Sequence, residues 1–379
     1  MLDPTISYIN HGSFGARLRE VYEFQQELKA ELERSPVDFL LRQGYRLEEA
    51  RNVVAGFLGA DIDGFGFVDN ATTGIGCAIQ DIELESGDEI LVTDHVYNGV
   101  RQLLKHKASY SNCSYREIEI GLTITNNGQI IEKVESAITS ATKVLVIDHV
   151  ASATSIVFPV KEIIKICRNK GVFVIVDGAH APGMLDLNIC DLNPDWYVGN
   201  LHKWVCAPLG AGFIWASKEQ RANTHPMTIS HPYLEGYKRE FEWQGTKDIT
   251  PWLSSSEAVK IWQEVGWEEI RKHNHELATW MQLTLVQEFG VTEVSALDGS
   301  MIGNMATVRL PDWCPNNMDS CLLFMNELFT KYQIEVPVFE FQGNAVIRVS
   351  AQLYSAKSDI TTLISAIEDK HVCNSDLTP

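Results

Sequence analysis

Short apolar runs rich in β-branched residues recur through the first two-thirds of the chain, and amphipathic stretches separate them. Apolar runs of about 4–8 residues that end at small or polar residues predict buried strands, and apolar residues at helical spacing predict helices between them. Strands that alternate with helices predict a mostly parallel sheet covered on both faces. The clearest predicted strands are residues 65–68, 89–93, 143–148, 172–176, 195–198 and 211–215, and helices are predicted at 18–33, 37–58, 129–138 and 160–169.

Helical spacing dominates the chain after Thr250 and gives way to two further strands. This pattern predicts a smaller α+β domain. The predicted elements are helices at 252–265, 267–289 and 358–369 and strands at 305–310 and 345–349. We therefore expect an N-terminal segment, residues 1–17, that packs with the small domain and the active site, a large domain, residues 18–249, and a small α+β domain, residues 250–379.

Asp177 ends one predicted strand, and Lys203 follows the end of the next. Ligands in open α/β sheets bind outside the carboxyl ends of the strands, which places Asp177 where chemistry usually takes place. A pyridoxal 5'-phosphate (PLP) site needs a lysine that bonds covalently to the cofactor aldehyde and an acid that keeps the pyridine nitrogen protonated. Taken alone, Asp177 could equally cap a turn, and Lys203 could be a solvated surface lysine.

The residues around this pair resemble the class V aminotransferase family of fold-type-I PLP enzymes. The similarity extends over residues 8–354 and is greatest to the isopenicillin N epimerase-like branch, which also holds the C–S (sulfoxide) lyases of ergothioneine and ovothiol biosynthesis. The motifs that carry it are Asp177-Gly178-Ala179-His180 and Asn200-Leu201-His202-Lys203-Trp204.

The resemblance implies an α/β fold of the type-I PLP transferases, with a mostly parallel, seven-stranded type of sheet in a large domain and a small α+β domain at the C-terminus. It implies PLP as the cofactor. Lys203 becomes the catalytic lysine that also binds the cofactor, and Asp177 becomes the partner of the pyridine nitrogen.

Thr72 and Thr73 follow the first predicted strand and open a helix. Backbone N–H groups and hydroxyls at a helix N-terminus bind phosphate without a lysine, although a threonine there is more often a plain N-cap. The resemblance makes both threonines phosphate ligands, together with His202. It also implies that Thr246 reaches the phosphate of the neighbouring subunit, so we expect a homodimer with a shared active site.

Three further positions match cofactor-binding residues of the family. Tyr97 aligns with an aromatic residue that stacks on the pyridine ring, although a lone loop tyrosine often only packs on its neighbours. Ser152 lies in a segment that flanks the ring, where it could bind the ring hydroxyl or cap a turn. His180 aligns with a residue that reaches the ring's phenolic oxygen, although such a histidine is often only structural.

Arg348 matches the arginine that binds the substrate α-carboxylate in the family. A planar, permanently charged guanidinium suits this role because it pairs with a carboxylate through two parallel hydrogen bonds. Asn10 and His11 are expected on the substrate side, because the corresponding segment of relatives folds back over the active site. Leu209 departs from the branch, where arginine is common at this position, so any contact made there is in doubt.

The absence of a cysteine at one position narrows the set of reactions that we expect. Cysteine desulfurases carry a nucleophilic cysteine shortly before the carboxylate-binding arginine, and residues 333–347 contain none. We therefore expect a C–S lyase that cleaves a cysteine conjugate, such as a histidine-derived cysteine sulfoxide, by β-elimination to a sulfur-bearing fragment, pyruvate and ammonia. Amino-acid epimerase and aminotransferase are the alternatives. A PLP-fold protein that only binds a ligand is disfavoured, because it would not need Asp177, Lys203 and Arg348 together.

Composition excludes some partners. The formal net charge of −19 argues against nucleic acid and anionic membrane surfaces, and no stretch approaches a membrane span. The eight cysteines show no CxxC pair and no zinc-like spacing, so no metal site is expected. Scattered cysteines and the lack of a signal-like N-terminus favour a cytoplasmic enzyme that acts on a small amino-acid substrate.

Overall fold

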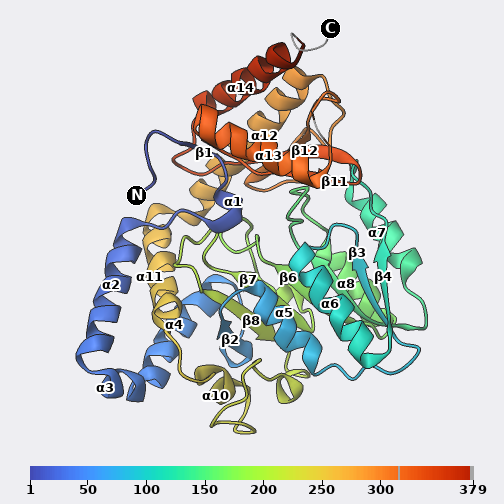
Figure 1. The fold of residues 1–379 in the computed structure, drawn as a ribbon. Coiled ribbons are helices and arrows are strands. Elements are labelled where there is room, and N and C mark those ends of the chain that lie inside the picture. Colours follow the sequence, from blue (N-terminus) through green and yellow to red (C-terminus); the bar gives the residue numbers. More distant parts are fainter. Residues whose placement is uncertain (315, 376–379) are drawn as a thin grey trace.

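A sheet of seven strands forms the centre of the lower part of the molecule (Figure 1). The computed structural model describes residues 1–314 and 316–375. The strands of this sheet are β2 (Phe65–Val68), β3 (Glu89–Thr93), β4 (Ser114–Ile118), β5 (Thr142–Asp148), β6 (Phe173–Gly178), β7 (Trp196–Asn200) and β8 (Gly212–Ala216). Their order is β2-β8-β7-β6-β5-β3-β4. Only β8 runs against its neighbours β2 and β7, so the predicted mostly parallel sheet is confirmed.

Helices cover both faces of the sheet, because the buried strands are apolar on both sides. In β6, Val174 and Val176 join one apolar cluster, whereas Ile175 between them joins another, as the alternation of side chains along a strand requires. The second cluster holds α5 (Ala71–Gln80) and α6 (Asn98–Ser111). The first holds α4 (Gln43–Phe57), α7 (Asn127–Ala137) and α8 (Val160–Asn169).

A second, three-stranded antiparallel sheet lies in the upper part of the molecule (Figure 1). Its strands are β9 (Met305–Arg309), β11 (Val338–Phe341) and β12 (Asn344–Ser350), with β12 in the middle. Helices α12 (Trp267–Phe289), α13 (Met318–Tyr332) and α14 (Lys357–Ser375) share its apolar cluster. Strand β1 (Ser7–Tyr8) pairs in parallel with β10 (Ile334–Glu335), which ties the N-terminal segment to this part.

Helix α11 (Thr250–Val265) lies at the predicted boundary between the domains. Its residues Trp252 and Val259 belong to the apolar cluster of the seven-stranded sheet, whereas Met281 of α12 belongs to that of the smaller sheet. The predicted boundaries stay a prediction, and we propose that the second lies nearer Trp267 than Thr250.

Two local expectations differ from the structure. The helix predicted over residues 37–58 divides at Arg42 into α3 (Pro36–Leu41) and α4, and it follows α2 (Arg19–Arg34). Strand β4 was not predicted because it is an edge strand of polar composition, in which Arg116 pairs with Glu89 of β3. Short helices α1 (His11–Phe14), α9 (Ile189–Leu192) and α10 (Tyr237–Glu242) complete the described chain, with 3₁₀ turns η1 (Ile62–Gly64) and η2 (Arg221–Asn223).

Among the helices of residues 1–314 and 316–375, none is long and apolar enough to cross a membrane.

Candidate active site

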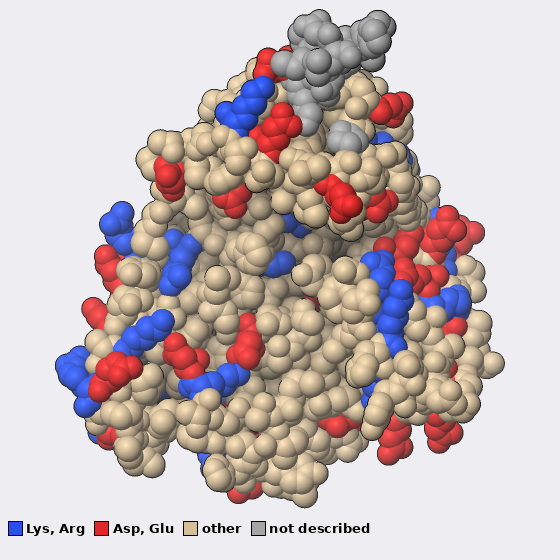
Figure 2. Space-filling view, viewed as in Figure 1, with Lys and Arg blue, Asp and Glu red and all other residues tan. Residues whose placement is uncertain are grey.

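A cavity of about 730 Å³ lies at the carboxyl ends of β5, β6 and β7, beneath the smaller sheet. Figure 2 shows the surface hollowed between the upper and lower parts of the molecule, with basic side chains inside the hollow. Nine of the residues predicted from the sequence line the cavity: Thr72, Thr73, Tyr97, Ser152, Asp177, His180, His202, Lys203 and Arg348. Gly12 and Ser13 also line it, so segments more than 300 residues apart contribute to one cavity.

Lys203 lies in the turn after β7, and its amine is enclosed by protein. Its Nζ lies 3.0 Å from Nε2 of His180. Burial and the nearby charge of Arg348 lower the pKa of Lys203 to about 7, against the opposing effect of Asp177 and Asp148. An amine whose pKa lies near 7 has a substantial neutral fraction at neutral pH, and the neutral form can act as a nucleophile or as a base.

Segments that are distant in the chain hold the Lys203 turn in place. Gly15 has a φ of 69°, and a Cβ there would lie 2.5 Å from the backbone oxygen of Lys203. His11 packs on Trp204, with ring centroids 4.8 Å apart, and its Nε2 lies 3.1 Å from the same backbone oxygen. The N-terminal segment thus packs directly against the lysine turn.

Asp177 projects from the end of β6, and its Oδ1 accepts a hydrogen bond of 2.9 Å from the backbone N–H of Ala179. Burial raises its pKa. The following glycine packs so closely on Tyr197 that a Cβ at Gly178 would lie 2.3 Å from the ring. His149 fixes that ring, because its Nδ1 lies 2.8 Å from the Tyr197 hydroxyl.

Asp148 is a second buried carboxyl in the cavity and was not among the predicted site residues. It is the register partner of Asp177 on the neighbouring strand, and its Oδ2 has no hydrogen-bond partner among the described residues. Burial and the charge of Asp177 raise the pKa of Asp148 well above its ordinary value. The sequence carried a signal for it, since Asp148 ends a predicted strand just as Asp177 does.

His180 has one ring nitrogen left over. If Lys203 donates to Nε2, the ring proton is on Nδ1, and this atom is buried with no partner among the residues that the structure describes. Burial, followed by the charges of Lys203 and Arg348, lowers the pKa of His180 well below its usual value, so the ring is neutral. A neutral imidazole with a free N–H offers a donor to an oxygen in the cavity.

The N-terminus of α5 provides hydrogen-bond donors beside the cavity. Asn70 caps this helix by accepting from the backbone N–H of Thr73 at 2.9 Å, and Asn200 accepts from that of Ala71 at 2.8 Å. Thr72 and Thr73 line the cavity with this helix end. Because these two backbone N–H groups are already bonded, the helix dipole and the Thr72 side chain are what favour an anion here.

His202 lines the cavity near this anion site, but its neutral ring has no proton on Nε2 to donate to an anion. Its Nδ1 lies 3.1 Å from the backbone oxygen of Ala211 and so carries the proton of the neutral ring. Burial and the charge of Lys203 lower the pKa of His202 to about 4. The predicted contact of His202 with a phosphate stays a prediction and would require a second proton on the ring.

Arg348 reaches the cavity from β12. Its Nη1 donates to the backbone oxygen of Ser152 at 2.6 Å and its Nη2 to Oγ of Ser13 at 3.0 Å. The guanidinium carbon lies 5.4 Å from the centre of the Phe339 ring. Burial lowers its pKa to about 10, which leaves it charged at neutral pH. Ser152 therefore holds Arg348, and its predicted contact with a cofactor stays a prediction.

Three predicted residues do not line the cavity. Thr246 is exposed. Asn10 accepts a hydrogen bond from Ser13 at 2.5 Å. His11 is buried with both ring nitrogens engaged, since its Nδ1 lies 2.7 Å from the Tyr354 hydroxyl. Gly12, Ser13 and Phe14 line the cavity, whereas Asn10 and His11 do not.

Several lining residues were missed by reasoning from the sequence. Ser13 and Phe14 lie next to the predicted pair Asn10 and His11, one turn further along the chain. Phe339 lies on β11 in a stretch without a motif, and no local pattern distinguishes it from a core residue.

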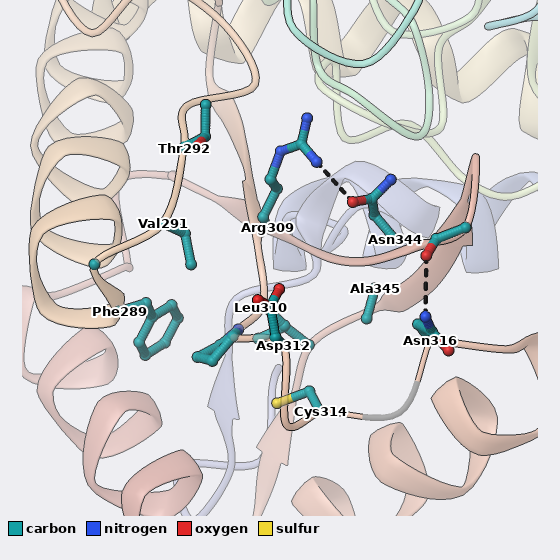
Figure 3. Close-up of a pocket in the computed structure, with 13 residues that line it drawn as sticks. Phe289, Val291, Thr292, Arg309, Leu310, Asp312, Cys314, Asn316, Asn344 and Ala345 are labelled. Carbon is teal, nitrogen blue, oxygen red and sulfur yellow. Dashed lines mark hydrogen bonds between the residues drawn. The ribbon is translucent and has the colours of Figure 1, made fainter.

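A second cavity, of about 500 Å³, lies beside the smaller sheet (Figure 3). Arg309 points across it to Asn344, whose Oδ1 accepts from Nη1 at 2.6 Å. Its described lining contains no lysine and no histidine. It therefore lacks the amine and imidazole groups that meet around Lys203, although Asp312 gives it one carboxyl group.

Among the known proteins that resemble this chain, three are similar to it over nearly its whole length. Isopenicillin N epimerase of Streptomyces clavuligerus is 29% identical over 97% of this chain and 96% of its own. L-cysteine desulfhydrase of Arabidopsis thaliana is 28% identical over 96% and 87%. Hercynylcysteine sulfoxide lyase of Schizosaccharomyces pombe is 25% identical over 97% and 95%. These proteins include the branch expected from the sequence motifs.

A solved structure shows the same fold. A lysine-to-alanine mutant of C-DES, with glycine covalently linked to its PLP cofactor, superposes with a TM-score of 0.85 at 19% identity and covers 97% of each chain. The model of the family described as aminotransferase class-V matches residues 16–322. The chain therefore belongs to the class-V aminotransferase family, a family of PLP-dependent enzymes.

Proposed function

We propose that the protein is a PLP-dependent C–S lyase that cleaves a cysteine conjugate by β-elimination. The observation that carries the proposal is Lys203, whose pKa is lowered to about 7, in one cavity with the charged Arg348. A base and a carboxylate-binding cation in one cavity are what removal of an amino acid's Cα proton requires. The similarity to a cysteine desulfhydrase and a sulfoxide lyase supports cleavage of a C–S bond.

The residues of the cavity fit PLP chemically. Lys203 would hold the cofactor aldehyde and Asp177 its pyridine nitrogen, while Thr72, Thr73 and the N-terminus of α5 would hold its phosphate. The unpartnered Nδ1 of His180 is a donor for the ring oxygen. When bound, PLP supplies an acceptor for the electron pair left at the substrate Cα.

The roles of the chain's own groups follow from their positions. Arg348 binds the α-carboxylate and so fixes the direction of the Cα–H bond. Lys203, as the neutral amine, takes the Cα proton. The Cβ–S bond then breaks, and the sulfur leaves with the bonding pair as a thiolate or, from a sulfoxide, as a sulfenate. The remaining 2-aminoacrylate reacts with water to give pyruvate and ammonia.

A lyase needs one base, whereas an epimerase needs a second acid or base on the opposite face of Cα. His11, one candidate for that group, does not line the cavity, and both its nitrogens are engaged. Tyr97 lines the cavity and remains the other candidate. This difference favours the lyase, with epimerase and aminotransferase as the alternatives. A protein that only binds a ligand is the least supported.

The substrate, assembly and compartment are finer parts of the proposal. The similarity to a hercynylcysteine sulfoxide lyase motivates a histidine-derived cysteine sulfoxide as one candidate substrate. We propose a homodimer, because Thr246 is exposed, lies outside the cavity of its own chain and would contribute to that of the partner. The scattered cysteines, which form no CxxC pair in the sequence, motivate the cytoplasm as the compartment.

The test uses purified protein loaded with PLP. The wild type is expected to show a visible absorbance band of lysine-bound cofactor and to release pyruvate from S-alkyl-L-cysteines or their sulfoxides. Lys203→Ala is expected to lose both, and the exposed Lys218→Ala serves as the matched control. Lysine-bound cofactor without pyruvate, but with exchange of the Cα proton in heavy water, would support the epimerase instead.

A further inference from the structure

We infer that the substrate's sulfur carries an apolar, uncharged substituent, and that Leu209 is a residue that sets this specificity. The inference rests on the proposed C–S lyase function and narrows its substrate class. It moves the preferred substrate away from histidine-derived conjugates and from cystine, because these carry a second carboxylate.

Apolar side chains line much of the cavity. Phe14 from α1, Leu209 from the loop before β8 and Phe339 from β11 all line it, together with the ring of Tyr97. Leu209 and Phe14 are 59% and 64% exposed. A substrate group that covers such side chains removes apolar surface from water, which favours an alkyl or aryl substituent.

The cavity lining contains few positively charged side chains. Among the described residues that line the cavity, Lys203 and Arg348 are the only lysine and arginine, and His180 and His202 are held neutral by burial. In the proposed function Lys203 binds the cofactor and removes the Cα proton, and Arg348 binds the α-carboxylate. The lining that this chain contributes therefore has no cation for a second carboxylate.

Acidic groups also lie along the cavity. Asp69, Asp148 and Asp177 also line the cavity. Lys247, the partner of Asp69 at 2.6 Å, is already paired and is not itself part of the lining. A carboxylate on the substituent would find no cation in this lining and would lie near these acidic groups, which disfavours its binding relative to an apolar substituent.

Leu209 is the position at which this selectivity can be changed. Its side chain is largely exposed and lies on the rim, so a larger polar residue fits without disturbing the core. Leu209→Arg would place a cation beside the substituent. Leu209→Met changes the shape of the side chain but not its charge and is the matched control.

The experiment compares S-propyl-L-cysteine with S-(2-carboxyethyl)-L-cysteine, which differ in little but the terminal methyl and carboxylate. We expect the wild-type kcat/KM for the propyl substrate to be higher by about tenfold or more. Leu209→Arg is expected to narrow this ratio about tenfold by raising the value for the carboxyethyl substrate. Leu209→Met is expected to keep the wild-type preference.

Equal values for the two compounds in the wild type, or a preference for the carboxyethyl compound, would overturn the inference. A ratio unchanged in Leu209→Arg would remove the role of Leu209. If neither compound yields pyruvate, the proposed function fails, and the change in the spectrum of bound PLP then measures the Kd of each compound. Tighter binding of the propyl compound would still support the inference, and equal or weaker binding would refute it.

Discussion

The amine of Lys203 lies 3.0 Å from Nε2 of the buried His180, and both residues line one cavity. This contact leaves Nδ1 of His180 as a donor without a partner among the described residues, and the buried lysine is easily deprotonated. The two residues come from neighbouring strand ends, so the sheet sets their separation.

Lys203 is expected to titrate near pH 7 in the apoprotein. Burial and the charge of Arg348 lower the pKa of Lys203 from its ordinary value of 10.5 to about 7. The rate of covalent PLP binding should therefore rise to a plateau with a midpoint near pH 7. Stopped-flow absorbance after mixing with PLP measures this rate, and a midpoint near pH 10 would contradict the prediction.

The same shift predicts a dependence of stability on pH. Between pH 7 and 10.5 the unfolded chain keeps the Lys203 proton and the folded apoprotein does not. The free energy of unfolding should therefore gain a contribution that rises with pH across this window. Urea unfolding of the wild type and of Lys203→Met, which lacks the contribution, isolates it. Parallel profiles of the two proteins would show that Lys203 is not desolvated.

Asp148→Asn is expected to stabilise the apoprotein at neutral pH by about 1 kcal/mol, or roughly 2 °C in Tm. The pKa of Asp148 is raised by burial and by Asp177, so its charge opposes folding once the pH exceeds the unfolded value of 3.8. The gain should disappear as the pH falls toward 4. Asp177→Asn is the matched comparison, because it alone should weaken PLP binding strongly.

Arg348→Lys and Arg348→Gln should raise KM for an S-alkylcysteine by different amounts. The guanidinium is oriented by the backbone oxygen of Ser152 and by Ser13, and lysine cannot reproduce two parallel hydrogen bonds to a carboxylate. We expect about tenfold for the lysine variant and about 100-fold for the glutamine variant. Steady-state pyruvate assays check both, and an unchanged KM in either variant would refute the assigned role.

Gly178→Ala should destabilise the fold by about 2 kcal/mol or more. The new Cβ would lie 2.3 Å from the Tyr197 ring, which His149 holds in place. Gly56→Ala is the matched control, because a Cβ there meets nothing within 4 Å and the residue is helical. We expect the control to be neutral or slightly stabilising. Thermal unfolding of the two variants should separate them by several degrees.

The strand-end residues were the part of the site that could be predicted from the pattern of the chain. Asp177 and Lys203 follow apolar runs, and parallel strands bring such ends together. Arg348 was placed only by resemblance, because it lies 335 residues from its partner Ser13. No sequence pattern marked Phe339 as a site residue. His11 was expected to face the substrate, but it packs on Trp204 and supports the turn that carries Lys203.

The most direct measurement of the proposed function follows two products in one sample. PLP-loaded protein is incubated with S-propyl-L-cysteine in heavy water, and mass spectrometry counts pyruvate and recovered amino acid that carries deuterium at Cα. The account predicts pyruvate in large excess over the deuterated amino acid, with pyruvate lost in Lys203→Ala. Deuterated amino acid without pyruvate would contradict the lyase and favour the epimerase.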